Sequence, residues 1–318
     1  MAPHGTTTGT NLRIGFAGPA MTARDLLRRA RYWPVLNGVA TSVARAAFDA
    51  LGHPPEAVIR HLHRVGTVRR RLPNGRTLVL WSRADDWISN QVFWRGWDGY
   101  EPETSRTFFR LAGRARVTID VGAYVGFYSL LAAHANPAGQ VHAFEPHPAV
   151  FERLTRNVGL NGADNVACHA LAAGAADGAA DFHFVPGGLP SSSSLSLPFM
   201  ADSGVGLESR RVRVVTLDSF SREAALRQLD LVKVDTESTE PDVLGGMVSV
   251  LEQHRPHIIC EVLAGRADEG RLEAILRPLG YRFYVLKEGG PAPADHVRAE
   301  APWLNHLFVH ETRTGELG

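Results

Sequence analysis

The sequence predicts an α/β protein: a Rossmann-like, seven-stranded, mostly parallel sheet with helices on both faces, preceded by a helical and β-hairpin extension. From residue 117 onward, short apolar runs alternate with helical patterns, as a doubly wound parallel sheet requires. A glycine turn joins the first run to a helix, and an Asn-Gly dipeptide marks an earlier hairpin. We expect a disordered start at 1–20, the extension at 21–110 and the main domain at 111–318.

Composition is that of a soluble enzyme without a general affinity for nucleic acid. Thirty-four basic residues stand against thirty-three acidic ones, although residues 64–76 are locally basic. Cys168 and Cys260 each fall in an expected buried strand and imply neither a disulfide framework nor a zinc site. The first twenty residues contain no apolar core typical of a leader, and no run is long enough to span a membrane. We therefore expect a cytoplasmic protein without membrane contacts.

The extension is expected to contain helices, a hairpin and an aromatic segment. Residues 21–63 have helical patterns whose arginines suit a solvated face. Alternating runs at 65–72 and 77–81 enclose Pro73-Asn-Gly75, the strongest short hairpin signal. The aromatic segment Trp87–Tyr100 suits a core or domain-docking surface, with a stacking wall over a cofactor or acceptor as the alternative.

The main domain is divided by its hydrophobic pattern. Residues 241–252 place apolar side chains at helical spacing, with Pro241 in the first turn. The segments 181–185 and 211–217 alternate like paired strands, and they flank a Ser- and Gly-rich stretch at 187–206. Such a stretch is either a mobile insertion or a lid over a site. The strands of the main sheet are expected at 117–121, 140–145, 166–172, 230–235, 257–262, 281–287 and 305–310.

The most informative motif is the glycine turn after the first of these strands. Its spacing is Asp-x-Gly-x-x-x-Gly, from Asp120 through Gly122 to Gly126, rather than the Gly-x-Gly-x-x-Gly of dinucleotide sites. A ligand without a phosphate that ends in a zwitterionic amino acid suits such a loop, because Asp120 can face a sulfonium or ammonium. Glu145, at the end of the next strand, can accept two hydrogen bonds from a ribose diol, although a surface salt bridge is the plainer alternative.

At these motifs the sequence resembles the FkbM-type family of S-adenosylmethionine-dependent methyltransferases. The resemblance spans roughly residues 85–310 and departs from the family at Tyr124, usually Asn, and at Ser238, usually Gly. It implies a sheet whose last strand is antiparallel, S-adenosyl-L-methionine as cofactor, and transfer to a hydroxyl of a secondary metabolite or sugar. The blocks that carry it are Asp120–Ser129, His142–Pro146, Asn157–Asn161, Leu231–Glu237 and Pro256–Glu261.

Ligands of open α/β sheets bind beyond the carboxyl ends of the strands, so the site is expected there. Asp235 is expected to face the methionine part of the cofactor or to act as base. Glu237 is a candidate general base or acceptor-orienting group, with helix capping as the alternative. The expected catalytic residues are thus Asp235 and Glu237. The expected cofactor-binding residues are Asp120, Gly122, Ala123, Tyr124, Gly126, Glu145, Pro146, Ala172 and Asp235.

Other polar residues are open to simpler interpretations. Glu261 is as consistent with a satisfied buried acid as with an active-site group, and Lys233 is expected to be paired or packed rather than catalytic. Asp235, Glu237 and Glu261 can be oxygen ligands for a hard cation, but without an adjacent Asp-Asn pair we expect no metal. Among the histidines, His147 and His306 lie near the expected cleft, where exposure alone explains a loop histidine. His134 and His142 fit a helix end and a strand.

The preferred hypothesis is an S-adenosylmethionine-dependent O-methyltransferase acting on a hydroxylated small-molecule acceptor. A nucleotide-dependent oxidoreductase is disfavoured by the missing third glycine. A non-catalytic cofactor-binding scaffold remains as an alternative because of Tyr124 and Ser238. The sequence leaves the acceptor and the formation of a homo-oligomer open.

Overall fold

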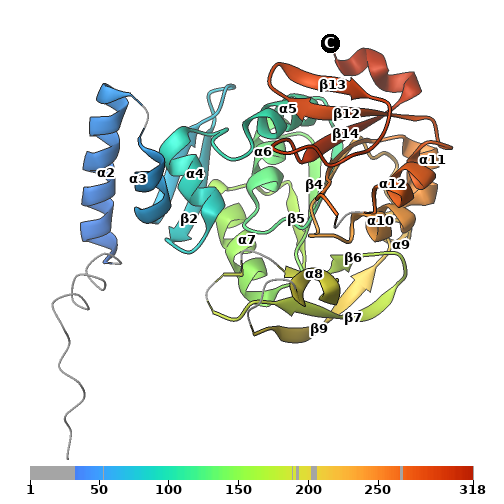
Figure 1. Ribbon diagram of the computed structural model, residues 1–318, viewed down its shortest axis with the longest axis horizontal. Helices are drawn as coiled ribbons and strands as arrows, with labels where there is room; N and C mark the ends of the chain where they lie inside the picture. Colours follow the sequence, from blue (N-terminus) through green and yellow to red (C-terminus); the bar gives the residue numbers. More distant parts are fainter. Residues whose placement is uncertain are drawn as a thin grey trace, which may run out of the picture.

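A computed structural model describes residues 33–317, except 53, 188, 191, 192, 202–205, 266 and 267. Its centre is an eight-stranded sheet of order β13-β12-β14-β11-β10-β3-β4-β5 (Figure 1). The strands β11, β10, β3, β4 and β5 run parallel, and β14 is antiparallel to both of its neighbours. The expected α/β class and the antiparallel last strand are therefore confirmed. The strands are β3 (Val117–Val121), β4 (Gln140–Phe144), β5 (Val166–His169), β10 (Leu231–Val234), β11 (His257–Glu261), β12 (Tyr281–Lys287), β13 (Gly290–Ala294) and β14 (Asn305–His310).

The eighth strand corrects the predicted seven. β13 pairs with β12 through a turn at Gly289 and Gly290, both at positive φ. Its two prolines, Pro291 and Pro293, argue against a strand, but β13 lies at the end of the sheet, where a missing backbone donor is tolerated. The edge position, which is a tertiary property, is what allows this proline-containing segment to form a strand.

Two predicted elements are divided in the structure. The strand expected at 166–172 ends at His169, and β6 (Ala172–Ala173) joins a different sheet. The helix expected at 241–252 is split into α10 (Glu240–Gly245) and α11 (Val248–His254). At the break, a Cβ on Gly246 would lie 2.1 Å from the carbonyl oxygen of Gly174. This close approach of two backbones, invisible to periodicity, separates the helices.

Helices cover both faces of the main sheet, as Figure 1 shows. The helices on one face, which include α6 (Phe127–Ala135), form a first group, and those on the other face, which include α9 (Leu217–Glu223), form a second. Along β10, Val232 and Val234 pack with the second group, whereas Leu231 packs with the first. Lys233 alternates with Val232 and Val234, so it faces the first group. This alternation sets which polar side chains meet behind the site. The first group is α5 (Pro102–Ala112), α6 (Phe127–Ala135) and α7 (Pro148–Asn161), and the second is α9 (Leu217–Glu223), α10, α11 and α12 (Glu269–Leu276).

A second, four-stranded sheet of order β6-β9-β7-β8 lies beside the main one. β7 (Gly178–Phe184) and β9 (Glu208–Val215) are antiparallel, which confirms the pairing expected from their alternation. The Ser- and Gly-rich stretch contributes β8 (Ser193–Ser194), which pairs with the end of β7, and α8 (Leu197–Ala201). Part of the stretch expected as a loop is therefore ordered against this sheet.

The extension precedes the main domain and packs on α7. The predicted hairpin is confirmed: β1 (Val65–Arg71) pairs antiparallel with β2 (Thr77–Arg83). The helical expectation for 21–63 is met by two helices, while residues 1–32, including the start expected to be disordered, lie outside the described residues. The helices of the extension are α2 (Pro34–Leu51), α3 (Glu56–His61) and α4 (Trp87–Arg95).

Side chains of α7 complete the hydrogen bonding of β2. Asn161 accepts from the Val79 amide at 2.9 Å and donates to the Val79 carbonyl at 2.6 Å. One turn earlier, Asn157 accepts from the Trp81 amide at 2.9 Å, and Arg153 donates to the Trp81 carbonyl at 3.1 Å. The three side chains are spaced four residues apart, so they lie on one face of the helix. They serve the hairpin in place of a third strand.

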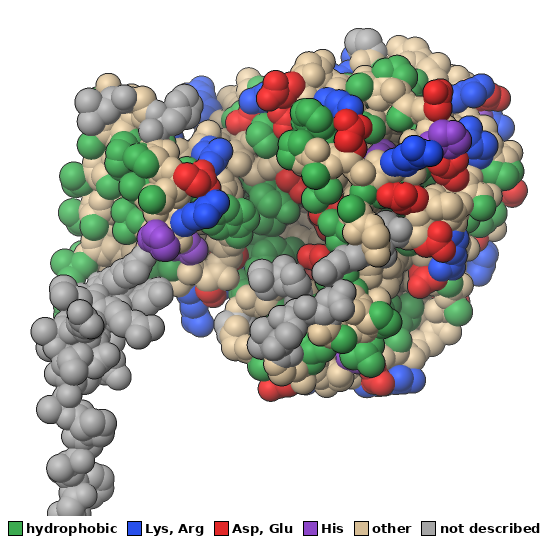
Figure 2. Space-filling model, viewed as in Figure 1, with side chains coloured by type: hydrophobic (Ala, Val, Ile, Leu, Met, Phe, Trp, Pro, Cys, Tyr) green, Lys and Arg blue, Asp and Glu red, His purple; other side chains and the backbone are tan. Residues whose placement is uncertain are grey.

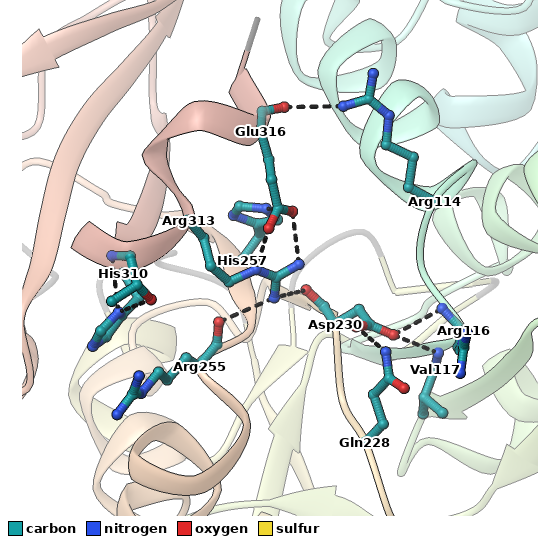
Figure 3. Close-up of polar contacts among 11 residues, drawn as sticks. Arg114, Arg116, Val117, Gln228, Asp230, Arg255, His257, His310, Arg313 and Glu316 are labelled. Atoms are coloured by element: carbon teal, nitrogen blue, oxygen red, sulfur yellow. Dashed lines mark hydrogen bonds and ion pairs between the residues drawn. The ribbon is translucent and has the colours of Figure 1, made fainter.

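The last helical turn, η1 (Glu311–Leu317), is held against the amino ends of the central strands (Figure 3). Arg313 pairs with Glu316 at 2.8 Å and donates to the carbonyls of Asp230 and Arg255. The Arg313 hydrogen bond lowers the pKa of Glu316 to about 2. This network lies at the end of the sheet opposite the expected site.

Two smaller expectations concern the cysteines and membranes. Cys168 and Cys260 are both free thiols, and only Cys260 is fully buried, since Cys168 is half-buried in β5. Within the described ranges, no helix combines the length and the apolar character needed to cross a bilayer.

We predict that Asn157→Ala lowers the free energy of unfolding by about 2–4 kcal/mol, because it leaves the Trp81 amide and the Val125 carbonyl without their partner. Urea unfolding measures the loss. Gly159→Ala, on the same helix with no atom within 4 Å of the added Cβ, is the control and should stabilise by about 0.5–1 kcal/mol. Equal effects of the two variants would contradict the role given to Asn157.

Candidate active site

A cavity of about 510 Å³ opens at the carboxyl ends of β3, β4 and β10. It is the hollow in the middle of the face shown in Figure 2, where hydrophobic side chains gather around the opening. The structure brings together at its wall most of the residues predicted from the sequence: Gly122, Ala123, Tyr124, Glu145, Pro146, Ala172, Asp235 and Glu237. Asp120 and Gly126 are not among the described residues that line it.

The two glycines of the turn are required by the protein's own atoms. Gly122 has φ +77°, and a Cβ there would lie 1.8 Å from the backbone oxygen of Asp235. Gly126 has φ +86°, and a Cβ there would lie 2.6 Å from a methyl of Leu154. Both positions therefore favour glycine for conformation, and Gly122 also needs it for space because its contact is with backbone. At Gly122, the close approach to the backbone is made by the loop after β10.

Glu145 is tied to the glycine loop by one carboxylate oxygen and to the residue before α7 by the other. One accepts from the Tyr124 amide at 3.1 Å and the other from the His147 amide at 2.8 Å. Burial raises the pKa of this carboxyl to about 8, against the two hydrogen bonds that lower it. Each carboxylate oxygen has a second lone pair, so Glu145 can hold the loop and still accept a hydrogen bond from a ligand in the cavity.

The two departures from the family pattern occupy the same kind of backbone conformation. Tyr124 has φ +49° and Ser238 has φ +83°, both in the left-handed region. Asn and Gly, the residues usual at these positions, adopt it with least strain, which explains the pattern from which this chain departs. Glu237 also lies there, at φ +56°. At these positions this chain therefore places residues that adopt the left-handed region less readily than Asn or Gly.

Tyr124 contributes its ring to the wall of the cavity. The ring packs in a small apolar cluster with Ile88 of α4 and Leu189 of the Ser- and Gly-rich stretch. Its hydroxyl is buried and has no hydrogen-bond partner in the described structure. Burial raises the pKa of that hydroxyl, with the charges of Asp85 and Asp86 adding to the effect.

Asp120 lies behind the wall, in a buried polar row across the strands. It accepts from the Ser129 hydroxyl at 2.5 Å and is the register partner of Lys233 on β10. Burial raises the pKa of Asp120 to about 6. Lys233 is fully buried, with its ammonium 3.0 Å from Asp235. The expectation that Lys233 is paired rather than catalytic fits this arrangement. Asp120 lies behind the cavity wall, so it would act on a bound ligand through its charge and not by direct contact.

An acidic cluster adjoins the same end of the cavity. Carboxylate oxygens of Glu101, Asp235 and Glu261 all lie within 4.8 Å of one another. Burial, followed by repulsion from Asp235, raises the pKa of Glu261 to about 10, and burial also raises the pKa of Glu101. Oxygen ligands at this spacing can hold a hard cation, but the Lys233 ammonium already pairs with Asp235. The trio differs from the expected one, with Glu101 in the place of Glu237.

Glu101 is the member that the sequence reasoning missed. It directly precedes α5 at φ +44° and accepts from the Tyr128 hydroxyl at 2.6 Å. An acidic residue before a helix with Pro at its first position reads as an ordinary helix start, so nothing local distinguishes it. Only packing of the extension on α6 brings it to the site.

Some of the remaining candidate residues line the cavity, and others are buried in the core. Trp87 and Tyr100 of the aromatic segment line the cavity, as does Tyr128, whereas Phe93 and Trp94 are buried in the core. The segment therefore supplies both core and a wall. Glu240, rather than Glu237, accepts from the Thr236 amide of the loop at 2.8 Å, and the N-cap residue of α10, Thr239, has no side-chain cap hydrogen bond.

The histidines do not line the cavity within the described part of the chain. The ring centroids of His147 and Phe184 lie 4.5 Å apart, and His306 is fully buried inside β14. His134 ends α6 and His142 stacks on His169, as fits the structural roles expected for them.

Comparison with known proteins identifies the class. Residues 120–283, a little more than half of the chain, match the family model described as the methyltransferase FkbM domain. The chain therefore belongs to the FkbM methyltransferase family and is a methyltransferase, which confirms the resemblance seen in the sequence.

The relatives are distant. Methyltransferase 1 of Beauveria bassiana is 25% identical over 189 residues, which is 55% of this chain and 76% of that protein. The 31-O-demethyl-FK506 methyltransferase FkbM of Streptomyces tacrolimicus is 26% identical over 253 residues, which is 70% of this chain and 90% of that protein. The crystal structure of methyltransferase FkbM from Methylobacillus flagellatus KT aligns at 17% identity with a TM-score of 0.40, covering 70% of this chain and 54% of that one. The chain thus spans about half the length of that crystallised protein.

We predict that Glu261→Gln stabilises the protein increasingly as pH rises. The folded-state pKa of about 10 exceeds the usual 4.5, so the contribution of the protonated acid is complete below pH 4.5 and is lost as pH approaches 10. Gln imitates the neutral acid, so its advantage in unfolding free energy should grow by up to about 1.4 kcal/mol per pH unit. Urea unfolding near pH 5, 7 and 9 measures it.

Glu252→Gln, which removes an exposed carboxylate from α11, is the matched control. Parallel pH profiles for Glu261→Gln and the wild type would contradict the raised pKa.

Proposed function

We propose that this methyltransferase uses S-adenosyl-L-methionine to methylate a hydroxyl of a small molecule, a secondary metabolite or a sugar. The observation that carries the proposal is the convergence of Glu145, Asp235 and Glu237 on one cavity at the carboxyl ends of β4 and β10. This is where ligands of open α/β sheets bind.

The cavity residues fit the parts of this cofactor. Glu145 stands where a ribose diol would be held, and Phe144, Pro146 and Phe182 line the adjoining wall that would receive the adenine. At the other end lie the carboxylates of Asp235 and Glu237, with Tyr100 and Tyr128 beside them. Carboxylates and aromatic faces both attract a cationic centre such as a sulfonium.

Bound there, the cofactor would supply an already activated methyl group, so the protein has three tasks: to align the acceptor, exclude water and take up a proton. Glu237 is the proposed base for the acceptor hydroxyl, because it lines the cavity and carries a carboxylate that can take up a proton. Asp235, held by Lys233 at 3.0 Å, is the proposed partner of the methionine end. Trp87, Tyr124 and Leu195 form apolar walls that would keep water out.

Oxygen as the accepting atom is supported by a relative rather than by a residue. The Streptomyces tacrolimicus relative is named as a methyltransferase of 31-O-demethyl-FK506. The oxidoreductase interpretation has no further support, since the chain belongs to a methyltransferase family. The same family membership weighs against the scaffold interpretation.

The proposal is tested by calorimetry with S-adenosylmethionine and with NAD, followed by transfer of labelled methyl to a panel of hydroxylated acceptors. Binding of S-adenosylmethionine with methyl transfer to a hydroxyl is expected. Binding of NAD alone would overturn the cofactor assignment. Binding of S-adenosylmethionine without transfer to any acceptor of the panel would favour the scaffold.

We predict that Glu145→Ala weakens S-adenosylmethionine binding by about 10–100-fold and changes turnover at saturating cofactor much less. The variant loses the ribose partner and also the bonds that hold the Tyr124 and His147 amides. Calorimetry measures the affinity. Glu152→Ala, exposed on α7, is the control and should bind the cofactor like the wild type.

We predict that Glu237→Gln lowers kcat by about 100-fold or more while cofactor affinity stays within about 3-fold, because Gln keeps the shape but cannot take up a proton. Single-turnover rates separate chemistry from product release. An unchanged rate would show that Glu237 is not the base.

A further inference from the structure

The loop that carries Glu237 is strained and held from outside. Glu237 and Ser238 are consecutive residues with side chains in the left-handed region, at φ +56° and +83°. Such a pair is costly for L-residues and persists only where neighbouring structure over-determines it. The loop therefore needs an external restraint.

Ser194 supplies that restraint. Its hydroxyl lies 2.6 Å from the carbonyl oxygen of Glu237, to which it donates, and 3.3 Å from that of Thr236. The Ser194 hydroxyl oxygen in turn accepts a hydrogen bond from the Ser196 amide at 3.0 Å, which orients the hydroxyl. Ser194 is fully buried. The bond to Glu237 therefore exists away from competing water, where losing it is expensive.

The segment around Ser194 also belongs to the cavity. Ser194 is placed by β8, where it pairs with His183 at the end of β7. Its neighbours Ser193 and Leu195 line the cavity, together with Phe182 of β7. Ser193 and Leu195 thus line the cavity, while Ser194 between them bonds to the Glu237 backbone.

We propose that Ser194 is a positioning residue for methyl transfer: its hydroxyl holds the Glu237 carbonyl so that the strained loop presents the Glu237 carboxylate to the cavity. The inference rests on the proposed function, in which Glu237 is the base. It gives the Ser- and Gly-rich stretch a specific task, since the geometry of the catalytic loop depends on β8 being in place.

The test is a double-mutant cycle of Ser194→Ala and Ser238→Gly. Ser194→Ala should lower kcat about 10–50-fold while the KM for S-adenosylmethionine changes less than about 3-fold. Ser238→Gly removes the steric cost of the left-handed conformation, so in the Ser194→Ala background it should restore kcat at least about 5-fold. In the wild-type background it should change kcat less than about 2-fold. Additive effects would overturn the proposal.

Hydrogen exchange of peptides covering 235–240 gives a readout that does not need activity. Ser194→Ala should accelerate exchange there, and Ser238→Gly should partly reverse the change. A lower kcat with unchanged exchange would overturn the proposal, as would unchanged kcat and exchange. If wild-type protein transfers no methyl group, the proposed function fails, and exchange across the same cycle still decides whether Ser194 restrains the loop.

Two further variants guard against loss of folding and nonspecific effects. Ser194→Cys keeps the volume and a weak donor, so its kcat should lie between those of the wild type and Ser194→Ala. Ser196→Ala, in the same segment, leaves the Ser194 hydroxyl and its backbone contacts in place and should match the wild type in kcat. If Ser196→Ala lowers kcat as much as Ser194→Ala does, the assignment to Ser194 is wrong.

Discussion

The site depends on one steric contact between two loops, the approach of Gly122 to the backbone oxygen of Asp235. Because a Cβ at position 122 would come within 1.8 Å of that oxygen, the loops after β3 and β10 are interlocked. The Asp235 amide adds a hydrogen bond of 3.0 Å to the Val121 carbonyl. Asp235 and Glu237 are thereby set against the glycine loop, and the cavity takes its shape between them.

The charges behind the cavity follow from strand alternation. Asp120 and Lys233 face the same side of the sheet as register partners, and Asp235 follows two residues later on that side. An ammonium so deeply buried must be paired, and Lys233 pairs with Asp235 at 3.0 Å, while burial raises the pKa values of Glu261 and Glu101. The acidic end of the cavity thus combines a carboxylate paired with a buried ammonium and two carboxyls whose pKa values are raised by burial.

Local signals were sufficient for the strands that form the site. The runs ending at Val121, Phe144 and Val234 are short, apolar and bounded by turns, so the cavity residues at their carboxyl ends could be predicted. What could not be predicted depends on contacts between distant segments. Glu101 reaches the site only through docking of the extension, and the break at Gly246 arises from the Gly174 backbone. Ser194 and Glu237 are brought together in the same way, with no pattern linking their positions.

The side chains of α7 that bond to β2 have a consequence for the behaviour of the protein in solution. A two-stranded hairpin normally leaves the outward amides and carbonyls of each strand open, and each such row is a template for strand addition by another molecule. Here Arg153, Asn157 and Asn161 bond to the outward groups of Val79 and Trp81. Losing these side chains would therefore do more than loosen the extension: it would expose a β-edge able to recruit further copies, so self-association would accompany the loss of stability.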